Sequence, residues 1–245
     1  MAKWRRSEPV ASSAAPSTSA EQPSRPRPRS TRILTAGVVT FLTALVVIGT
    51  YQALPRPAGP AEPGAAAVDD LTVRDSSRRL SVAPDGKVTF VAFIDFECEI
   101  CGEVYPVVEQ LRAGYGDRVT FVVRYFPLEG HVNAQRAARA VEAAAQQGQL
   151  EAMYRRMFQT QPEWAEQQEP KDELFRRYAA DLGLDMDRWD AAYAADATWE
   201  PIQADIDDGL ALGVTATPAL FLNGDELEST SLLDLSRALD QALAR

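Results

Sequence analysis

Two short apolar runs identify the centre of a β-sheet. Val88–Ile94 and Val119–Phe126 are nearly continuous stretches of β-prone apolar residues, a pattern typical of strands covered on both faces. The segment between them predicts a helix from Cys98 to about Arg112. A strand, a helix and a strand in this order predict a right-handed crossover with parallel strands. Leu71–Val82 alternates weakly and predicts a short edge strand or hairpin.

The pattern then becomes helical before it returns to strands. Four or five helices are predicted, broken by glycine and proline, over Asn133–Gln147, Gln149–Gln161, Lys171–Leu182, Asp187–Tyr193 and Thr198–Leu212. Pro218–Leu222 predicts a strand, and Asn223-Gly224 predicts a tight hairpin turn into a short strand near Glu226–Glu228. A helix over Leu232–Ala244 follows. We therefore expect an α/β fold of order β-α-β, a helical insertion at about 131–212, then β-β-α.

A long uncharged segment precedes this pattern. Ile33–Leu54 contains 22 uncharged residues, which at ~1.5 Å per residue is enough to cross a ~30 Å hydrocarbon core. We expect one transmembrane helix at 32–54, with residues 33–54 in the lipid bilayer. Seven basic residues precede it and only Arg56 follows closely, so the N-terminus should be cytoplasmic and the C-terminal domain extracytoplasmic. A cleavable signal peptide is the alternative.

Composition divides the rest of the chain. Residues 1–31 are rich in Ser, Pro, Ala and Arg without apolar periodicity, which predicts a disordered basic tail. Residues 55–69 have the Pro, Ala and Gly content of a semi-extended linker. Residues 70–245 are about one domain in length, and carry 17 Lys and Arg against 31 Asp and Glu, a net charge of −14. This domain should not favour nucleic acid or an anionic membrane surface.

The chain has only two cysteines, Cys98 and Cys101, at the start of the first predicted helix. At this spacing the sulfurs can close a small disulfide ring, and the first faces the positive end of the helix, which favours a thiolate. The pair therefore suits thiol–disulfide exchange. An exported domain lies in an oxidising compartment, yet the chain offers no other pair for a structural disulfide.

Other uses of the cysteines are weaker. A structural disulfide across four residues would stabilise little. Structural zinc needs four ligands, so a site would have to be shared between two chains, and covalent haem is excluded in its usual form because Gly102 follows Cys101. We expect no metal and no organic cofactor.

Three motifs occur in order along the domain. They are Phe93 to Cys101 (FIDFECEIC), Arg124 to Leu128 (RYFPL) with His131 and Asn133-Ala134, and Gly213 to Gly224 (GVTATPALFLNG). With these motifs, the chain from about Lys87 to Ala244 resembles the thioredoxin superfamily, and within it the DsbA-like thiol–disulfide oxidoreductases, which have a helical insertion and often a membrane anchor. The resemblance implies a thioredoxin-like fold.

The resemblance also implies residue roles. Cys98 would be the exposed nucleophile and Cys101 the buried resolving thiol. Thr217-Pro218 would form a cis peptide beside the pair. The backbone near Thr217 would pair with an extended substrate segment. Apart from the resemblance, Phe96 and Ile100 flank the cysteines and could form part of an apolar docking surface.

Two positions depart from the family pattern. One affects how the proton of the resolving thiol is handled, and the other affects the turn before Thr217. Ala92 stands where many relatives carry a buried Asp or Glu that handles the proton of the resolving thiol. Asp95 is no obvious substitute, because an odd step of three along a continuing strand points it to the other face. Ala216 occupies a glycine position before Thr217, which puts the turn geometry in doubt.

The third departure concerns charge. Glu99-Ile100 stands between the cysteines where strong oxidants have Pro-His, and Glu97, Glu99 and Glu103 oppose a thiolate at Cys98, weakly if they are exposed. We expect a reduction potential between about −120 mV and about −270 mV.

Two sets of aromatic residues are expected to be structural. His131 is the only histidine, and we expect it to cap or flank the following helix rather than to act in catalysis. Trp164, Trp189 and Trp199 are expected to lie in the core rather than in a substrate cleft.

These observations favour a membrane-anchored, extracytoplasmic thiol–disulfide oxidoreductase that introduces disulfides into exported proteins. Its partners would be the thiols of those proteins and, as the resemblance implies, a membrane quinone-linked protein that reoxidises it. The same fold could instead serve a reductase or isomerase. A tethered chaperone, or a copper-binding module using the two soft thiolates, is the alternative outside enzymes.

Overall fold

The computed structural model describes residues 71–245. The predicted tail (1–31), transmembrane helix (32–54) and linker (55–69) lie outside these residues. None of the helices in residues 71–245 combines the length and apolar character that a membrane span requires.

The centre of the fold is a five-stranded sheet of order β1-β3-β2-β4-β5. The strands are β1 (Arg78–Ser81), β2 (Thr89–Ile94), β3 (Thr120–Tyr125), β4 (Ala219–Leu222) and β5 (Asp225–Leu227). The central strands β2 and β3 are parallel, as the crossover predicted, and the other pairs are antiparallel. The predicted edge strand is therefore present in β1, although it covers only the last part of Leu71–Val82.

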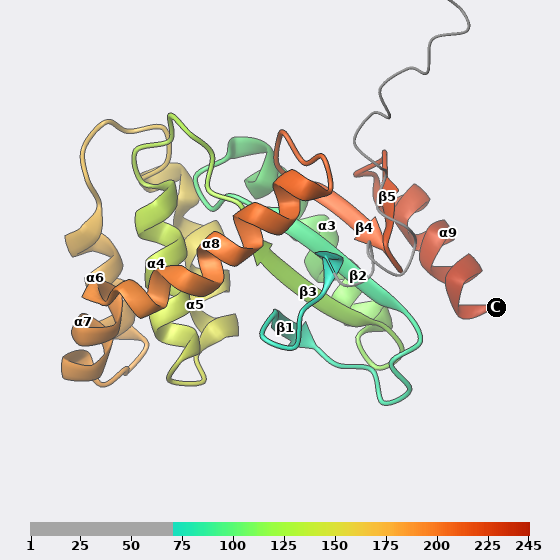
Figure 1. The fold of residues 1–245 in the computed structure, drawn as a ribbon, viewed down its shortest axis with the longest axis horizontal. Helices are drawn as coiled ribbons and strands as arrows, with labels where there is room; N and C mark the ends of the chain where they lie inside the picture. Colours follow the sequence, from blue (N-terminus) through green and yellow to red (C-terminus); the bar gives the residue numbers. More distant parts are fainter. Residues whose placement is uncertain (1–70) are drawn as a thin grey trace, which may run out of the picture. The chain divides into compact units, whose positions relative to one another are not determined.

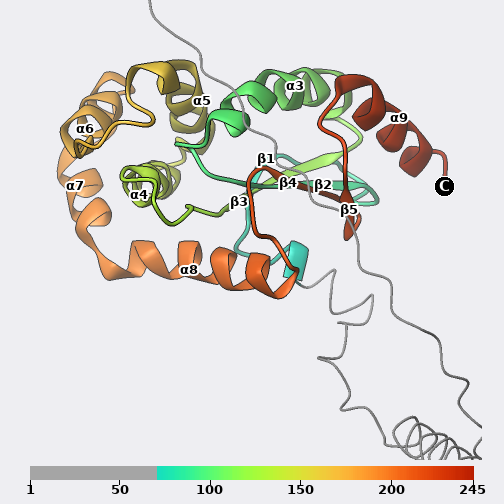
Figure 2. The same cartoon turned by 90° about the horizontal axis from the view of Figure 1, so that it is seen from above.

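Helices cover both faces of the sheet (Figure 2). Helices α3 (Glu99–Tyr115) and α9 (Leu232–Leu243) lie on one face, and α8 (Asp196–Ala211) lies on the other. The rest of the insertion gathers beyond one end of the sheet (Figure 1). It consists of α4 (Ala134–Ala145), α5 (Leu150–Thr160), the 3₁₀-helix η1 (Gln161–Glu163), α6 (Asp172–Asp181) and α7 (Met186–Ala194).

The two covered faces explain the continuous apolar runs. Along β2, Ala92 and Ile94 join the core beneath α3, whereas Val91 and Phe93 join the core beneath α8. Helix α8 approaches closely at Gly209, where a Cβ would lie 2.7 Å from the ring of Phe126. Trp164 and Trp189 are buried, as predicted, and Trp199 is partly buried against the same core.

Most predicted boundaries of helices and strands hold to within two or three residues, and the largest difference is at the start of β1. Pro162 lies inside the 3₁₀-helix that follows α5. Helix α8 starts two residues earlier than predicted, and Pro201 lies within it, as it does within the predicted range. The hairpin turn is confirmed, since Asn223 (φ 51°) and Gly224 (φ 88°) both have positive φ.

Candidate active site

The two cysteines lie where the central strand β2 passes into α3. Cys98 is the N-cap residue of α3, and Cys101 lies in its first turn. Both thiols are unpaired and buried, with exposed fractions of 8 % for Cys98 and 2 % for Cys101. Cys101 is buried as the resemblance implied, whereas the exposed Cys98 that it implied is wrong, because the Thr217-Pro218 loop packs against the Cys98 sulfur. They are thus at the carboxyl end of a parallel strand, the edge at which open α/β sheets place their sites.

The environment shifts the pKa values of the two thiols in opposite directions. A hydrogen bond from the Cys101 thiol makes the largest contribution to lowering the pKa of Cys98 to about 5, and the Thr217 hydroxyl and the amides of Cys101 and Ile100 add to it against the opposing effect of burial. Burial, followed by the interaction with Cys98, raises the pKa of Cys101 well above its usual value. At neutral pH the arrangement therefore holds one thiolate and one thiol.

The loop before β4 supplies the third side of the site. Thr217-Pro218 is a cis peptide, as the resemblance implied. The Cys98 sulfur lies 3.4 Å from the Thr217 carbonyl oxygen, to which it donates a hydrogen bond when it is protonated. Ala216 does not adopt a positive φ, so the absence of glycine there leaves the turn unstrained.

Glu97 does not oppose the Cys98 thiolate in the way we expected. Its side chain is buried, with 1 % exposed, and Oε2 accepts a hydrogen bond of 2.6 Å from the Asn133 backbone amide. Burial raises the pKa of this carboxyl, which disfavours its charged form. Glu99 and Glu103 are exposed, where water screens their charge.

Asp95 forms a buried ion pair with His131. The Asp95 Oδ2 atom lies 2.6 Å from His131 Nδ1, and the carboxylate also accepts from the backbone amides of Glu97 (2.8 Å) and Leu128 (3.0 Å). His131 flanks α4, as predicted, but its ring does not cap that helix, whose N-cap residue is Asn133. The pair ties the residues before Cys98 to the loop after β3.

The two predicted docking residues differ. Ile100 is exposed, with 49 % of its surface accessible. Phe96 does not form part of a docking surface as predicted, because it is only 1 % exposed and packs against Phe158 and Tyr154 of α5, with ring centroids 5.1 and 6.1 Å apart. Helix α5 covers this side chain, which the local sequence could not indicate.

Ala92 lies directly beneath the pair. With Cys101, Tyr105, Tyr154 and Pro218 it lines a small apolar cavity of about 10 Å³, and the other lining residues are Ile94, Val104, Val108, Phe158 and Leu220. No carboxyl group lines this space, and the Asp95 carboxylate binds His131 and backbone amides instead. Within residues 71–245, no cluster of three or more His, Cys, Asp or Glu side chains is arranged to hold a metal ion.

A family model described as thioredoxin matches residues 82–241, which is more than half of the chain and contains the whole site. The chain belongs to the thioredoxin family. The matched residues of this thioredoxin-family protein include the Cys98-Glu-Ile-Cys101 motif.

Solved structures share the fold of this thioredoxin-family protein. A thioredoxin-like oxidoreductase from Silicibacter pomeroyi DSS-3 is 25 % identical, with a TM-score of 0.62 over 72 % of this chain and 98 % of that one. The thiol–disulfide exchange protein α-DsbA2 from Wolbachia pipientis is 19 % identical, with a TM-score of 0.61 over 72 % and 92 %. A structure from Salmonella enterica serovar Typhimurium, described as a periplasmic thioredoxin-like protein, is also 19 % identical, with a TM-score of 0.58 over 73 % and 97 %.

Curated relatives of this thioredoxin-family protein are longer. The Na⁺/H⁺ antiporter NhaA 1 of Mycolicibacterium gilvum (strain PYR-GCK) is 32 % identical over 216 residues, or 83 % of this chain. The chain spans about a third of the length of that relative, 32 %.

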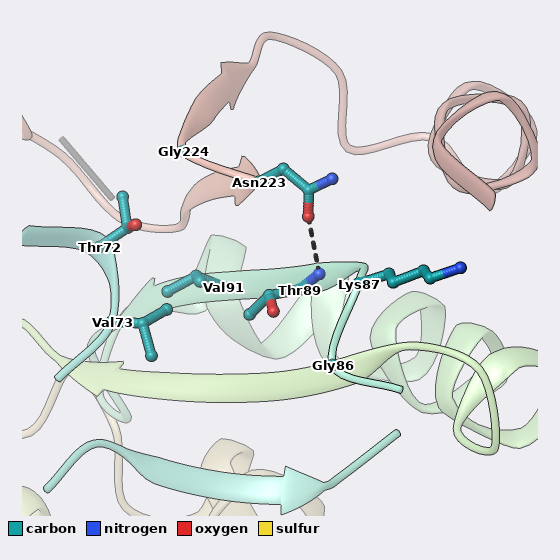
Figure 3. A pocket seen from close by; sticks show the side chains of 8 residues that line it. All are labelled: Thr72, Val73, Gly86, Lys87, Thr89, Val91, Asn223 and Gly224. Carbon is teal, nitrogen blue, oxygen red and sulfur yellow. Dashed lines mark hydrogen bonds between the residues drawn. The ribbon is translucent and has the colours of Figure 1, made fainter. Parts of the chain in front are cut away.

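A separate cavity lies at the opposite end of β2 (Figure 3). It has a volume of about 370 Å³, and its lining includes Lys87, Thr89, Asn223 and Gly224. The Asn223 side chain crosses it to accept a hydrogen bond of 2.8 Å from the Thr89 amide. The redox pair lies at the carboxyl end of the same strand, so this cavity is not part of the active site.

The sequence did not identify two polar contacts of the site. The contact between Asp95 and His131 joins residues 36 positions apart, so no local pattern predicts it. Gln161 was predicted only as the last residue of a helix, whereas its side chain reaches the backbone of Phe96 and Cys98. The one local signal for Gln161 was Gly102, a glycine within a helix where alanine would be more favourable.

Replacing His131 with glutamine should make the stability of the oxidised protein less dependent on pH. Burial lowers the pKa of His131, but the hydrogen bond and charge of Asp95 outweigh it, so the pKa lies above its usual value. The folded state thus binds this proton more tightly than the unfolded state, and the stabilisation is complete below about pH 6.5 and lost as pH rises through the raised pKa. His131→Gln should cost about 1–2 kcal/mol of unfolding free energy at pH 5.5 and less at pH 8.5.

Guanidinium unfolding of the oxidised wild type and variant at both pH values measures this difference. The oxidised form is used because neither cysteine then titrates. A cost that is equal at pH 5.5 and 8.5 would show that His131 acts only through packing.

Proposed function

We propose that this protein is a membrane-anchored, extracytoplasmic oxidase that introduces disulfides into exported proteins. The observation that carries the proposal is the stabilised thiolate at Cys98, with a pKa of about 5. Stabilising the reduced form of such a pair makes its disulfide a stronger oxidant. This value lies between about 7 for thioredoxin and about 3.5 for the strong oxidant DsbA, which agrees with a potential between about −270 mV and about −120 mV.

In the proposed cycle, Cys98 is the sulfur that substrates attack. A substrate thiolate attacks Cys98 Sγ in the oxidised pair, the Cys98–Cys101 bond breaks, and Cys101 leaves and takes up a proton. A second thiolate of the same substrate then attacks the substrate sulfur of the mixed disulfide, and Cys98 leaves as a thiolate. Two substrate thiols become one disulfide, two electrons reduce the protein pair, and no metal or organic cofactor is needed.

Substrates would lie along the cis-proline loop. The Thr217 carbonyl lies 3.4 Å from Cys98 Sγ, so an extended segment paired with the backbone at Thr217 and Pro218 would bring its cysteine to the reactive sulfur. The exposed Ile100, in the first turn of α3, would supply apolar contact. Phe96 would instead support the site from below.

The proposed location rests on the N-terminal sequence. A cytoplasmic tail (1–31), one transmembrane helix (32–54) and a linker (55–69) would hold the domain (70–245) outside the membrane. Similarity to part of proteins named as antiporters supports a membrane setting, and the periplasmic relative supports an extracytoplasmic one. In that position the pair could pass its electrons to a membrane quinone-linked partner.

The redox state of Cys98 and Cys101 in growing cells tests the direction of electron flow. Cells are quenched with acid, free thiols are labelled with a mass tag, and a Cys101→Ser variant is used to trap mixed disulfides. A mostly oxidised pair with exported proteins trapped on Cys98 is the expected result. A mostly reduced pair with trapped proteins would contradict the oxidase and favour a reductase or isomerase.

The double variant Cys98→Ser/Cys101→Ser is the matched control for trapping. If no protein is trapped on the single variant beyond the level of this control, the exchange role fails. Client binding or Cu(I) binding would then be measured, to test a chaperone or a copper-binding module.

A further inference from the structure

The side chain of Gln161 reaches from the helical insertion into the turn that carries Cys98. Gln161 is the first residue of η1 and is buried, with 6 % exposed. Its Nε2 atom donates two hydrogen bonds, of 2.7 Å to the Phe96 carbonyl and 2.9 Å to the Cys98 carbonyl. Both hydrogens of the amide are therefore used on the backbone that flanks one reactive residue.

Gly102 provides the space for this contact. It lies within α3 and has no positive φ, so its backbone does not require glycine. A Cβ at this position would overlap Gln161 Oε1 and lie 2.8 Å from Gln161 Cδ. A glycine inside a helix costs about 0.5–1 kcal/mol relative to alanine, and here the cost is offset by letting the glutamine approach.

The hydrogen bond from Gln161 to the Cys98 carbonyl connects the insertion to a reactive residue. Cys98 caps α3 with its backbone alone, since no side chain caps the helix, and its carbonyl also accepts the first helical bond from the Gly102 amide at 3.2 Å. The orientation of this peptide sets how the Ile100 and Cys101 amides face the Cys98 sulfur. The amide of Gln161 also offsets two carbonyl dipoles whose negative ends lie near a thiolate.

We propose that Gln161 is a positioning residue for thiol–disulfide exchange, which holds the N-terminus of α3 so that its first amides face the Cys98 sulfur. The proposal rests on the proposed role of Cys98 as the sulfur that substrates attack and that leaves as a thiolate. It gives the helical insertion a second function besides covering the core, because Gln161 belongs to the insertion and its partners belong to the thioredoxin-like part.

Gln161→Glu tests the role with almost no change in shape. It replaces the donor with an acceptor beside two carbonyls and a thiolate, so the pKa of Cys98 should rise by roughly one unit. The equilibrium with glutathione should shift about tenfold toward the protein disulfide, which corresponds to about 30 mV. The pKa is measured from thiolate absorbance at 240 nm, and the equilibrium from the fraction reduced in glutathione buffers.

A double-mutant cycle tests whether the space at Gly102 serves Gln161. Gly102→Ala alone should displace the amide and raise the pKa of Cys98 in the same direction as Gln161→Ala. In the Gln161→Ala background the same change should have little further effect, because the obstructing side chain is gone. Fully additive shifts would overturn the proposed link between the two residues.

Gln167→Glu is the matched control, since Gln167 makes the same kind of bond, Nε2 to the Glu163 carbonyl at 2.8 Å, on the exposed side of the insertion. It should leave the pKa and the glutathione equilibrium unchanged. Folded Gln161→Glu and Gln161→Ala variants with wild-type values in both assays would overturn the proposal. A wild type without a thiolate titrating well below pH 8 would overturn the role of Cys98 itself, and the Gln161 proposal with it.

Discussion

Replacing Cys98 with serine should abolish thiol–disulfide exchange and remove the thiolate that titrates near pH 5. Cys98 carries the lowered pKa, and at pH 7 a thiol with a pKa of about 5 is almost wholly ionised. A serine hydroxyl is not ionised at this pH and cannot form the mixed disulfide. Oxidation of a two-cysteine peptide should fall to the uncatalysed rate, and the step in 240 nm absorbance near pH 5 should disappear.

Two variants of Cys101 separate its hydrogen bond from its redox role. Both Cys101→Ser and Cys101→Ala should accumulate mixed disulfides, because neither can resolve them. The Cys101 thiol makes the largest contribution to the low pKa of Cys98. Serine keeps a hydrogen-bond donor at this position and alanine does not, so the pKa of Cys98 should rise more in Cys101→Ala. A pKa that stays near 5 in Cys101→Ala would contradict this account of the thiolate.

The central sheet and the redox pair could be predicted because their signals are local. The runs that became β2 and β3 are nearly continuous in apolar residues, which is the pattern of strands that helices cover on both faces. The turn at Asn223-Gly224 needs only the two residues that adopt positive φ. Cys98 and Cys101 lie within four consecutive residues at the start of one helix, so their spacing already indicated that the two sulfurs are close together.

The supports of the site could not be predicted because their partners are distant in sequence. Phe96 follows the strand as an exposed flank would, and it is buried only because Tyr154 and Phe158 of α5 pack over it. Glu97 was counted as a charge beside the thiolate, yet the Asn133 amide 36 residues away holds it. In each case a segment of the insertion decides the environment of a residue in the active-site turn.

The same reasoning explains how the insertion contributes to the chemistry. Asp95, Glu97 and the carbonyls of Phe96 and Cys98 are each held by a residue from 128 to 161. The turn before α3 is thus fixed from outside the thioredoxin-like part. A low pKa at Cys98 requires that the amides facing its sulfur are already in place before the thiolate forms. The contacts from the insertion hold these amides in place.

Arg124 is a buried charged residue whose position in the apolar run of β3 the sequence pattern could not explain. It interrupts the apolar run of β3, is 0 % exposed, and points to the α8 face of the sheet. There its guanidinium pairs with Asp205 and Asp208 of α8, which are 81 and 84 residues later in the chain. It also donates to the carbonyls of Leu71 (2.9 Å) and Thr72 (2.7 Å), so one side chain joins the sheet, α8 and the start of the domain.

Replacing Arg124 with methionine should therefore destabilise the domain by about 3–5 kcal/mol. Methionine fills much of the volume, but it leaves two carboxylates and two carbonyls without their shared donor. Burial raises the pKa of Asp205 to about 6 even with the arginine beside it, and without that positive charge the pKa should rise further. The folded variant would then bind a proton that the unfolded chain releases, so its deficit in unfolding free energy should grow as pH increases from 5 to 8.

Guanidinium unfolding of the oxidised protein at pH 5 and pH 8 measures both effects. Arg118→Met is the matched control, because Arg118 is about half exposed and its pair with Asp117 is 3.6 Å long, so its loss should cost less than about 1 kcal/mol. If Arg124→Met costs no more than this control, the buried cluster does not hold α8 to the sheet. A deficit that shrinks as pH rises would mean that Asp205 is not the group left without its partner.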